Sequence, residues 1–236
     1  MVDRQRWYRL LANAPRERAE QPRRICELCV EMLGVTGAGI SMVTSTGNRE
    51  VVYTTDDISS QIENLQLTLG EGPCVDAQAS GMPILVGDLE APGDIVVDRW
   101  PTFLEGAKAA GARAVFAFPL RVGAINLGAL DMYRTAPGEL HGEAFPGALM
   151  AAEAAAIALL HLQTDEDGRF PDDLTDHTTY NARVHQATGM IKVQLDVTMQ
   201  EALLMLRARA FSLARPVEEV AADVVERRLR FSTEDR

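Results

Sequence analysis

The sequence predicts an α+β domain built on an antiparallel sheet, followed by a smaller all-α domain of three helices. Three observations support this prediction. Over residues 15–163, strand-like apolar runs in hairpin order stand between helical stripes. Over residues 176–231, apolar residues recur only at helical spacing. Residues 164–175 hold five acidic residues and one arginine with little apolar content, which is typical of a linker.

The larger domain is expected to begin with an amphipathic helix, because Ile25, Leu28 and Met32 recur at helical spacing and Gly34 provides a stop. Hairpins between flanking helices imply an antiparallel sheet covered by helices on one side. The last two strands alternate poorly between apolar and polar residues, so they are expected to be well buried. The predicted elements, in chain order, are a helix over 17–34, strands over 38–46 and 50–55 joined by a turn at 47–48, a helical patch over 58–67, a short helix between the glycine-rich loop and the next strand, a strand over 83–89, a helix near 101–114, strands over 114–122 and 127–133, and a helix over 144–163.

Each of the three C-terminal helices has its own signal. The second opens with Thr198 three residues before Glu201, the pattern of a capping box. The third opens at Pro216, whose fixed φ suits a first helical turn. About 55 residues bury only a small core, so this bundle is expected to rely on a dimer partner or on the larger domain. The first helix carries a continuous apolar stripe of Tyr180, Val184, Ala187, Ile191 and Leu195.

Composition excludes several classes of protein. With 47% hydrophobic and 24% charged residues, the chain is globular rather than disordered. No uninterrupted apolar run reaches the roughly 20 residues of a membrane-spanning helix, and the N-terminus lacks the apolar core of a signal peptide. Three cysteines, of which Cys26 and Cys29 share one predicted helix, favour a reducing compartment. We therefore expect a cytoplasmic protein without membrane contact.

Several motifs in the larger domain are shared with a known family. The segments LGEGPCVDA (69–77) and PILVGDL (83–89), followed by the paired strands VFAFPL and LGALDMY, resemble a GAF domain over roughly residues 15–163. The resemblance implies a module that senses small molecules and forms dimers. Members of this family bind ligands as different as cyclic nucleotides, haem and bilins, so the resemblance assigns no ligand and the cofactor is unknown.

A candidate pocket for an unidentified small molecule lies around the glycine-rich loop, because glycines allow close approach of backbone to a ligand. The alternative is that the glycines only shape turns and that the cysteine of this loop fills the core. The candidate ligand-binding residues are Gly72, Cys74, Asp76, Asp88 and Trp100.

The sequence predicts no catalytic residues and no metal site. Cys26 and Cys29 form a C-x-x-C, but they lie inside an apolar helical stripe, so buried thiols are the favoured interpretation. Four histidines are scattered singly, without the spacing of metal ligands. Some GAF-like proteins reduce methionine sulfoxide with pocket cysteines, but Cys74 has no evident resolving partner. We therefore do not expect an enzyme.

The C-terminal helices resemble a second family. Residues 182–225 are similar to the ANTAR domain, the three-helix RNA-binding output module of transcription antiterminators, most closely at Gln186–Ala187, Gly189–Ile191 and Glu219–Ala221. Family members bind leader RNA with two small stem-loops, which disfavours a competing terminator hairpin. Thr188 departs from the pattern, since many members carry Lys or Arg there.

The resemblance implies an RNA-binding surface on the outer faces of these helices. Arginine forks suit phosphate and can stack on unpaired bases. We expect no exposed aromatic residue for base stacking, because Tyr180 and Phe211 both fit core or dimer positions. The candidate RNA-binding residues are Arg183, Gln186, Ala187, Thr188, Gly189, Lys192, Arg207, Arg209 and Arg215.

Together these features predict a homodimeric regulator, in which a GAF sensor controls an RNA-binding ANTAR output through dimer geometry. The alternative is a GAF-based protein–protein interaction module that does not bind RNA. The net charge of −11 favours the alternative, whereas residues 176–230, with eight basic and seven acidic side chains, leave room for a polyanion.

Overall fold

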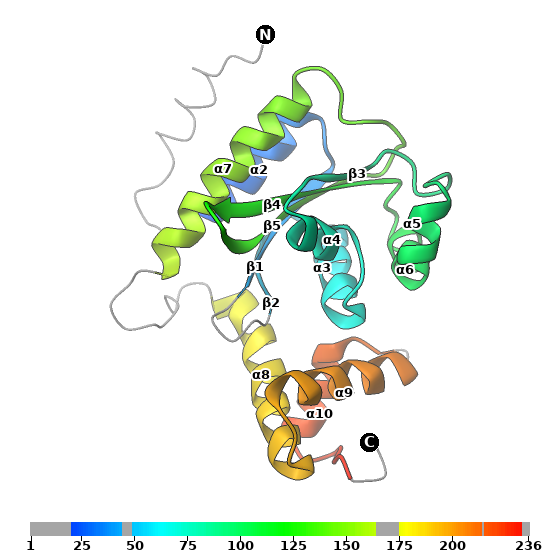
Figure 1. Ribbon diagram of the computed structural model, residues 1–236, viewed down its shortest axis with the longest axis vertical. Helices are drawn as coiled ribbons and strands as arrows, with labels where there is room; N and C mark the ends of the chain where they lie inside the picture. The colour runs from blue at the N-terminus through cyan, green and yellow to red at the C-terminus, as the bar shows by residue number, and fades with distance from the viewer. Residues whose placement is uncertain (1–19, 44–48, 164–174, 214, 233–236) are drawn as a thin grey trace.

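The computed structural model describes residues 20–43, 49–163, 175–213 and 215–232. Its centre is a five-stranded antiparallel sheet in the order β2-β1-β5-β4-β3 (Figure 1), which confirms the predicted α+β class. The predicted linker lies outside the described residues, except for Thr175, and so does the predicted turn at 47–48. The strands are β1 (Gly37–Val43), β2 (Arg49–Thr54), β3 (Ile84–Val86), β4 (Ala114–Val122) and β5 (Ile125–Arg134).

Helices cover both faces of this sheet. Helices α2 (Gln21–Leu33) and α7 (Ala144–Gln163) pack on one face, and α3 (Asp57–Leu69) and α4 (Pro73–Ser80) pack on the other (Figure 1). The prediction that helices cover one side only is therefore wrong. The physical reason lies in β1 and β5. Consecutive residues point to opposite faces of the sheet and are buried in both strands, so both faces must be covered.

Helix α7 is long and apolar enough to cross a membrane by length and composition, although half of that stretch is buried inside the protein. The sequence shows no uninterrupted apolar run of this length, because polar residues such as Glu153 interrupt the helix. The buried alanines of α7 let it pack closely against α2 and β4. The apolar composition of α7 is therefore accounted for by its packing in the core of the protein.

Helix α3 is held at a fixed angle over the sheet by its N-terminus. Asp56 and Ser59 form a capping box, and the Oη atom of Tyr133 in β5 donates to Oδ1 of Asp56 at 3.1 Å. Gly70 and Gly72, both with positive φ, then turn the chain sharply into α4. The turn lays α4 beside α3 on the same face of the sheet. Two short helices follow, α5 (Asp94–Arg99) and α6 (Pro101–Ala109), of which α6 packs against α3.

The C-terminal segment forms the three predicted helices, α8 (Thr175–Leu195), α9 (Met199–Ser212) and α10 (Val217–Val225). The capping box of Thr198 and Glu201 is present at the start of α9, as predicted. The three helices bury a common apolar core, and Leu67 of α3 belongs to this core. Helix α8 also runs beside β2, so the segment is docked on the sheet domain (Figure 1).

Candidate functional site

The described part of the chain holds a buried group of three ionisable side chains on the face of the sheet that α3 and α4 cover. Glu63 comes from α3, Cys74 from α4 and Asp131 from β5, and their ligand atoms all lie within 4.8 Å of one another. Their exposed fractions are 3%, 1% and 6%. We call these three residues the acidic thiol cluster. Buried carboxyl groups at this density are costly unless they are paired or bind a cation.

The backbone around the cluster is shaped to let it form. A Cβ atom on Gly39 in β1 would lie 2.9 Å from Oε1 of Glu63, so only glycine leaves space for this carboxyl group against the strand. Gln66 accepts a hydrogen bond from the backbone amide of Cys74 at 2.7 Å, which holds the start of α4 against α3. A Cβ on Gly72 would come within 2.8 Å of the same glutamine side chain. Thus the glycines and Gln66 together fix the position of the thiol.

One arginine contacts the cluster. Nη1 of Arg49 in β2 lies 3.6 Å from Sγ of Cys74, and its Nε donates to Oε1 of Gln78 at 2.7 Å. Several buried polar atoms beside it have no hydrogen-bond partner within the described residues. They are Oε1 of Glu63, Oδ2 of Asp131, Oγ of Ser41, Nε2 of Gln66 and Nε2 of Gln78. Glu63 interacts with Asp131 and Ser41, and Asp131 with Gln66, so these atoms face one another and a proton held between the two carboxyl groups would pair them.

Burial favours the protonated forms of all three side chains. It raises the pKa of Glu63 well above its ordinary value, and the neighbouring charge of Asp131 raises it further. Burial also raises the pKa of Asp131 to about 6 and that of the Cys74 thiol well above its ordinary value. Without a cation, Glu63 and Cys74 therefore keep their protons to higher pH than free groups do. A thiol in this state is a poor nucleophile.

The residues predicted to bind a small molecule do not form one site but fall into three groups. Gly72 and Cys74 lie at the cluster. Asp76 accepts a hydrogen bond from Nε1 of Trp100 at 3.0 Å and pairs with Arg99 at 2.8 Å, so Asp76 and Trp100 stabilise each other.

Asp88 lies elsewhere, because it pairs with Arg113 at 2.9 Å and lines a separate cavity of about 350 Å³ with Glu139. Glu63 and Asp131 were not predicted from the sequence. Asp131 has a signal, because it is an acidic residue inside the otherwise apolar run LGALDMY, whereas Glu63 has polar neighbours in QIENLQ.

Cys26 and Cys29 are free, fully buried thiols, as predicted. Burial raises the pKa of both groups, that of Cys29 to about 12. They lie in the core between α2 and the sheet. A redox role for this pair is therefore unfavourable, because the thiolate forms are suppressed.

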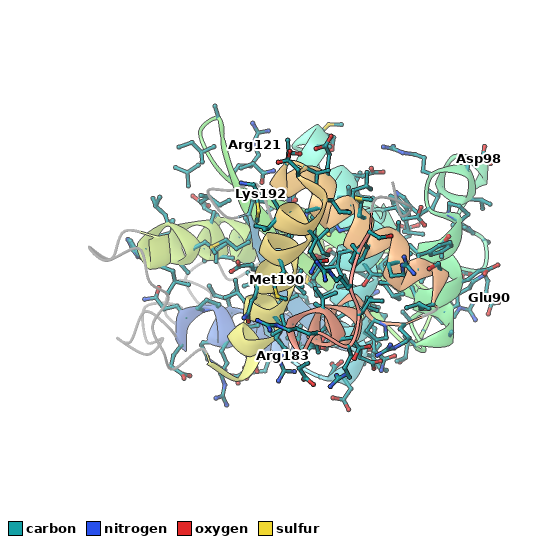
Figure 2. The ribbon with its side chains drawn as sticks, turned by 90° about the horizontal axis from the view of Figure 1, so that it is seen from below. Glu90, Asp98, Arg121, Arg183, Met190 and Lys192 are labelled. Carbon is teal, nitrogen blue, oxygen red and sulfur yellow. The ribbon has the colours of Figure 1, made fainter. Side chains whose placement is uncertain are left out.

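Part of the predicted RNA-binding surface is exposed along α8. Arg183, Gln186 and Lys192 are exposed, and a Cβ on Gly189 would meet nothing within 4 Å. Arg183 and Lys192 are nine positions apart, which corresponds to a rotation of about 180° around the axis of α8. The two side chains therefore lie at opposite edges of the exposed side of the helix. Between them lie Gln186, Gly189 and Val193, which is 82% exposed. We call these five residues the α8 track; Figure 2 shows Arg183 and Lys192 at its two ends.

Ala187 and Thr188 lie on the opposite side of α8 and are buried in the helical core. Oγ1 of Thr188 donates to the backbone oxygen of Val184 at 2.6 Å. This hydrogen bond satisfies the hydroxyl inside the helix. The side chain of Thr188 therefore serves the packing of α8 in this arrangement and faces away from the α8 track.

The three other predicted arginines are engaged within the protein. Arg207 of α9 lies against the turn between α3 and α4, since a Cβ on Gly70 would be 3.4 Å from its Nη1. Burial, and then the charge of Arg49, lower the pKa of Arg207 to about 10. Arg209 stacks over the ring of Phe231 at 5.4 Å. Arg215 pairs with two carboxylates of α10, at 3.1 Å and 2.8 Å. Helical periodicity does not reveal docking, ring stacking and ion pairing, which engage these three cations within the protein.

Phe211 was predicted at a core or dimer position, and its exposed fraction of 60% excludes the core position. It lines a cavity of about 510 Å³ whose other walls come from α3, α6 and the segment after α9 with Arg215 and Pro216. Leu65 and Gly106 contribute to those walls. The protein therefore does expose one aromatic ring near the C-terminal helices. Tyr180, the other aromatic residue considered for base stacking, lies where side chains are not described.

The comparisons with known proteins agree on the larger domain. The family model "GAF domain" matches residues 19–159. A GAF domain from a phosphoenolpyruvate-protein phosphotransferase of Coxiella burnetii is similar in structure, with a TM-score of 0.51, 16% identity and coverage of 67% of this chain and 91% of that chain. A GAF domain from the corresponding Acinetobacter protein has a TM-score of 0.51 at 8% identity, with the same coverage. No curated protein matches the chain significantly. With more than half of its residues matched and the five-stranded sheet in place, the chain belongs to the GAF domain family.

Proposed function

We propose that this protein is a cytoplasmic, non-enzymatic regulator in which the GAF domain senses a signal and the C-terminal helices bind RNA as an ANTAR output. The RNA is a leader transcript with two stem-loops, and binding favours transcription past a terminator. The observation that carries the proposal is the α8 track, where two cations border an open surface. A glycine at its centre lets a sugar–phosphate backbone approach closely.

The docking of the helices on the GAF domain supplies a means of control. Arg207 is held against the α3–α4 turn, beside the face of the sheet that carries the acidic thiol cluster. A signal that moves this turn would change the packing of α9 and thus the access of RNA to Arg207. Two outputs in a dimer would then engage two stem-loops with a raised effective concentration.

Replacing Arg183 and Lys192 together by alanine is expected to weaken binding of a two-stem-loop RNA by roughly 10-fold or more. Each lost phosphate contact also lowers the salt dependence of log K by about 1. Filter binding at two or more salt concentrations measures both quantities, and circular dichroism checks that helix content is unchanged.

The matched control replaces Arg121 and Lys108, which are exposed on the GAF domain, by alanine. This variant loses the same charge, so general electrostatic attraction predicts equal losses for both proteins. Equal losses, or unchanged binding in the α8 variant, would exclude the α8 track as the RNA interface. A wild-type protein that binds no such RNA would favour the protein–protein interaction module instead.

We propose that α7 forms the dimer interface. Its outer side exposes Leu149 and Ile157, at 43% and 47%. Replacing both by aspartate is expected to convert the protein to a monomer in sedimentation experiments, because each charge would face apolar surface across the interface. Aspartate at the exposed hairpin residues Val122 and Ile125 is the control and is expected to leave the mass unchanged. A dimer that survives the α7 changes would place the interface elsewhere.

A further inference from the structure

We propose that the acidic thiol cluster of Glu63, Cys74 and Asp131 binds one divalent transition metal ion of borderline softness, of the class of Zn²⁺ and Fe²⁺. The inference goes beyond the proposed function and does not depend on RNA binding. It rests on three ligand atoms from three separate elements that lie within 4.8 Å of one another. That separation suits side chains that share one ion.

The donor set selects the class of ion. Two carboxylates alone suit Mg²⁺ or Ca²⁺, which prefer oxygen ligands and retain water. The thiolate of Cys74 shifts the preference to ions that accept both sulfur and oxygen, as Zn²⁺ does. Three protein ligands also leave a coordination position open for water or a small molecule, which is the arrangement of reactive rather than structural sites.

A second observation points to a ligand. Oε1 of Glu63 and Oδ2 of Asp131 have no hydrogen-bond partner among the described residues, although both side chains are more than nine-tenths buried. In the metal-free protein a retained proton links Glu63 with Asp131, and Ser41 of the adjacent strand β1 interacts with Glu63. A cation would take the place of that proton. Orphaned oxygens in a dry site lose their hydration without compensation, and a bound cation would restore it.

The charges around the cluster also balance in the metal-bound form. Two carboxylates and one thiolate carry three negative charges, and a divalent ion with the guanidinium of Arg49 carries three positive ones. Arg49 lies 3.6 Å from the sulfur and is held there by Gln78, so it stabilises the thiolate from outside the ligand set. Metal binding displaces the protons of the ligands, and these leave to solvent.

The test uses the full-length protein, stripped of metal and titrated with Co²⁺ as a spectroscopic probe. We expect saturation at one Co²⁺ per chain, with a thiolate-to-cobalt charge-transfer band in the near ultraviolet, and displacement of Co²⁺ by Zn²⁺. Cys74→Ser is expected to remove the band. Glu63→Gln and Asp131→Asn retain the shape of each side chain and all thiols, and each is expected to weaken binding by at least 10–100-fold.

The control is the double variant Cys26→Ala and Cys29→Ala, which removes the other two thiols and is expected to retain the band. Loss of the band in this variant, or its survival in Cys74→Ser, would assign the metal to the C-x-x-C pair and overturn the proposal. So would the absence of saturable Co²⁺ binding, or unchanged affinity in both carboxamide variants. Circular dichroism of each variant establishes that it is folded, and if Cys74→Ser fails to fold, the two carboxamide variants decide.

Discussion

Replacing Phe118 by alanine is expected to lower the free energy of unfolding by about 4 kcal/mol, because a fully buried aromatic ring is lost from the core and leaves a cavity. Phe118 lies in β4, between the sheet and α7, and its ring centroid is 5.9 Å from that of Phe145. This contact joins α7 to β4. Urea denaturation followed by circular dichroism measures the change.

Ile125→Ala is the matched comparison, since Ile125 belongs to the next strand but is 61% exposed. Its loss is expected to change the free energy of unfolding by less than about 0.5 kcal/mol. Similar effects of the two substitutions would contradict the assignment of the core to this face of β4.

The metal-free protein is expected to lose stability as the pH rises from about 4 towards 7, and Glu63→Gln is expected to reduce that loss. The pKa values of Glu63 and Asp131 are raised by burial, that of Asp131 to about 6. A carboxyl group with a raised pKa in the folded state binds more protons there than in the unfolded chain. Its stabilising protonation is complete below the unfolded pKa and is lost as the pH rises through the folded pKa.

Glu63→Gln is expected to be more stable than wild type at pH 7 and equal to it at pH 4. Urea denaturation in the presence of a chelator measures this difference at both pH values. Glu105→Gln, at an exposed position of α6, is the control and should match wild type at both. A Glu63→Gln variant as pH-dependent as wild type would show that Glu63 ionises freely in the folded protein.

The periodicity of the sequence predicts most of the fold. Apolar spacing, glycine stops and capping patterns are local, and the helix caps at Asp56 and Thr198 have the geometry that such patterns imply. The helices over 58–67 and after the glycine-rich loop were predicted, but their place on the second face of the sheet was not, because spacing along the chain does not show which face a helix covers. Helix α3 also carries Glu63 and Gln66 on its buried side. Polar residues on a buried face lower the apparent amphipathicity of a helix.

The acidic thiol cluster was not predictable from spacing. Its members lie on α3, α4 and β5, and Asp131 is more than 50 residues beyond Cys74. Only the order of the strands brings them together, since β5 pairs with β1 at the centre of the sheet. The glycine-rich loop was predicted to approach a ligand; in the structure, the group next to Gly72 is the side chain of Gln66.

Leu67 couples the stability of the C-terminal helices to that of the GAF domain. It belongs to a helix of the GAF domain, yet its side chain completes the apolar core of the C-terminal helices. If these helices were fused to an unrelated sensor domain, their core would contain a cavity unless that domain supplied an apolar side chain in the place of Leu67. Recombination during evolution would therefore favour exchanges that carry α3 and the three helices together, as one inherited unit.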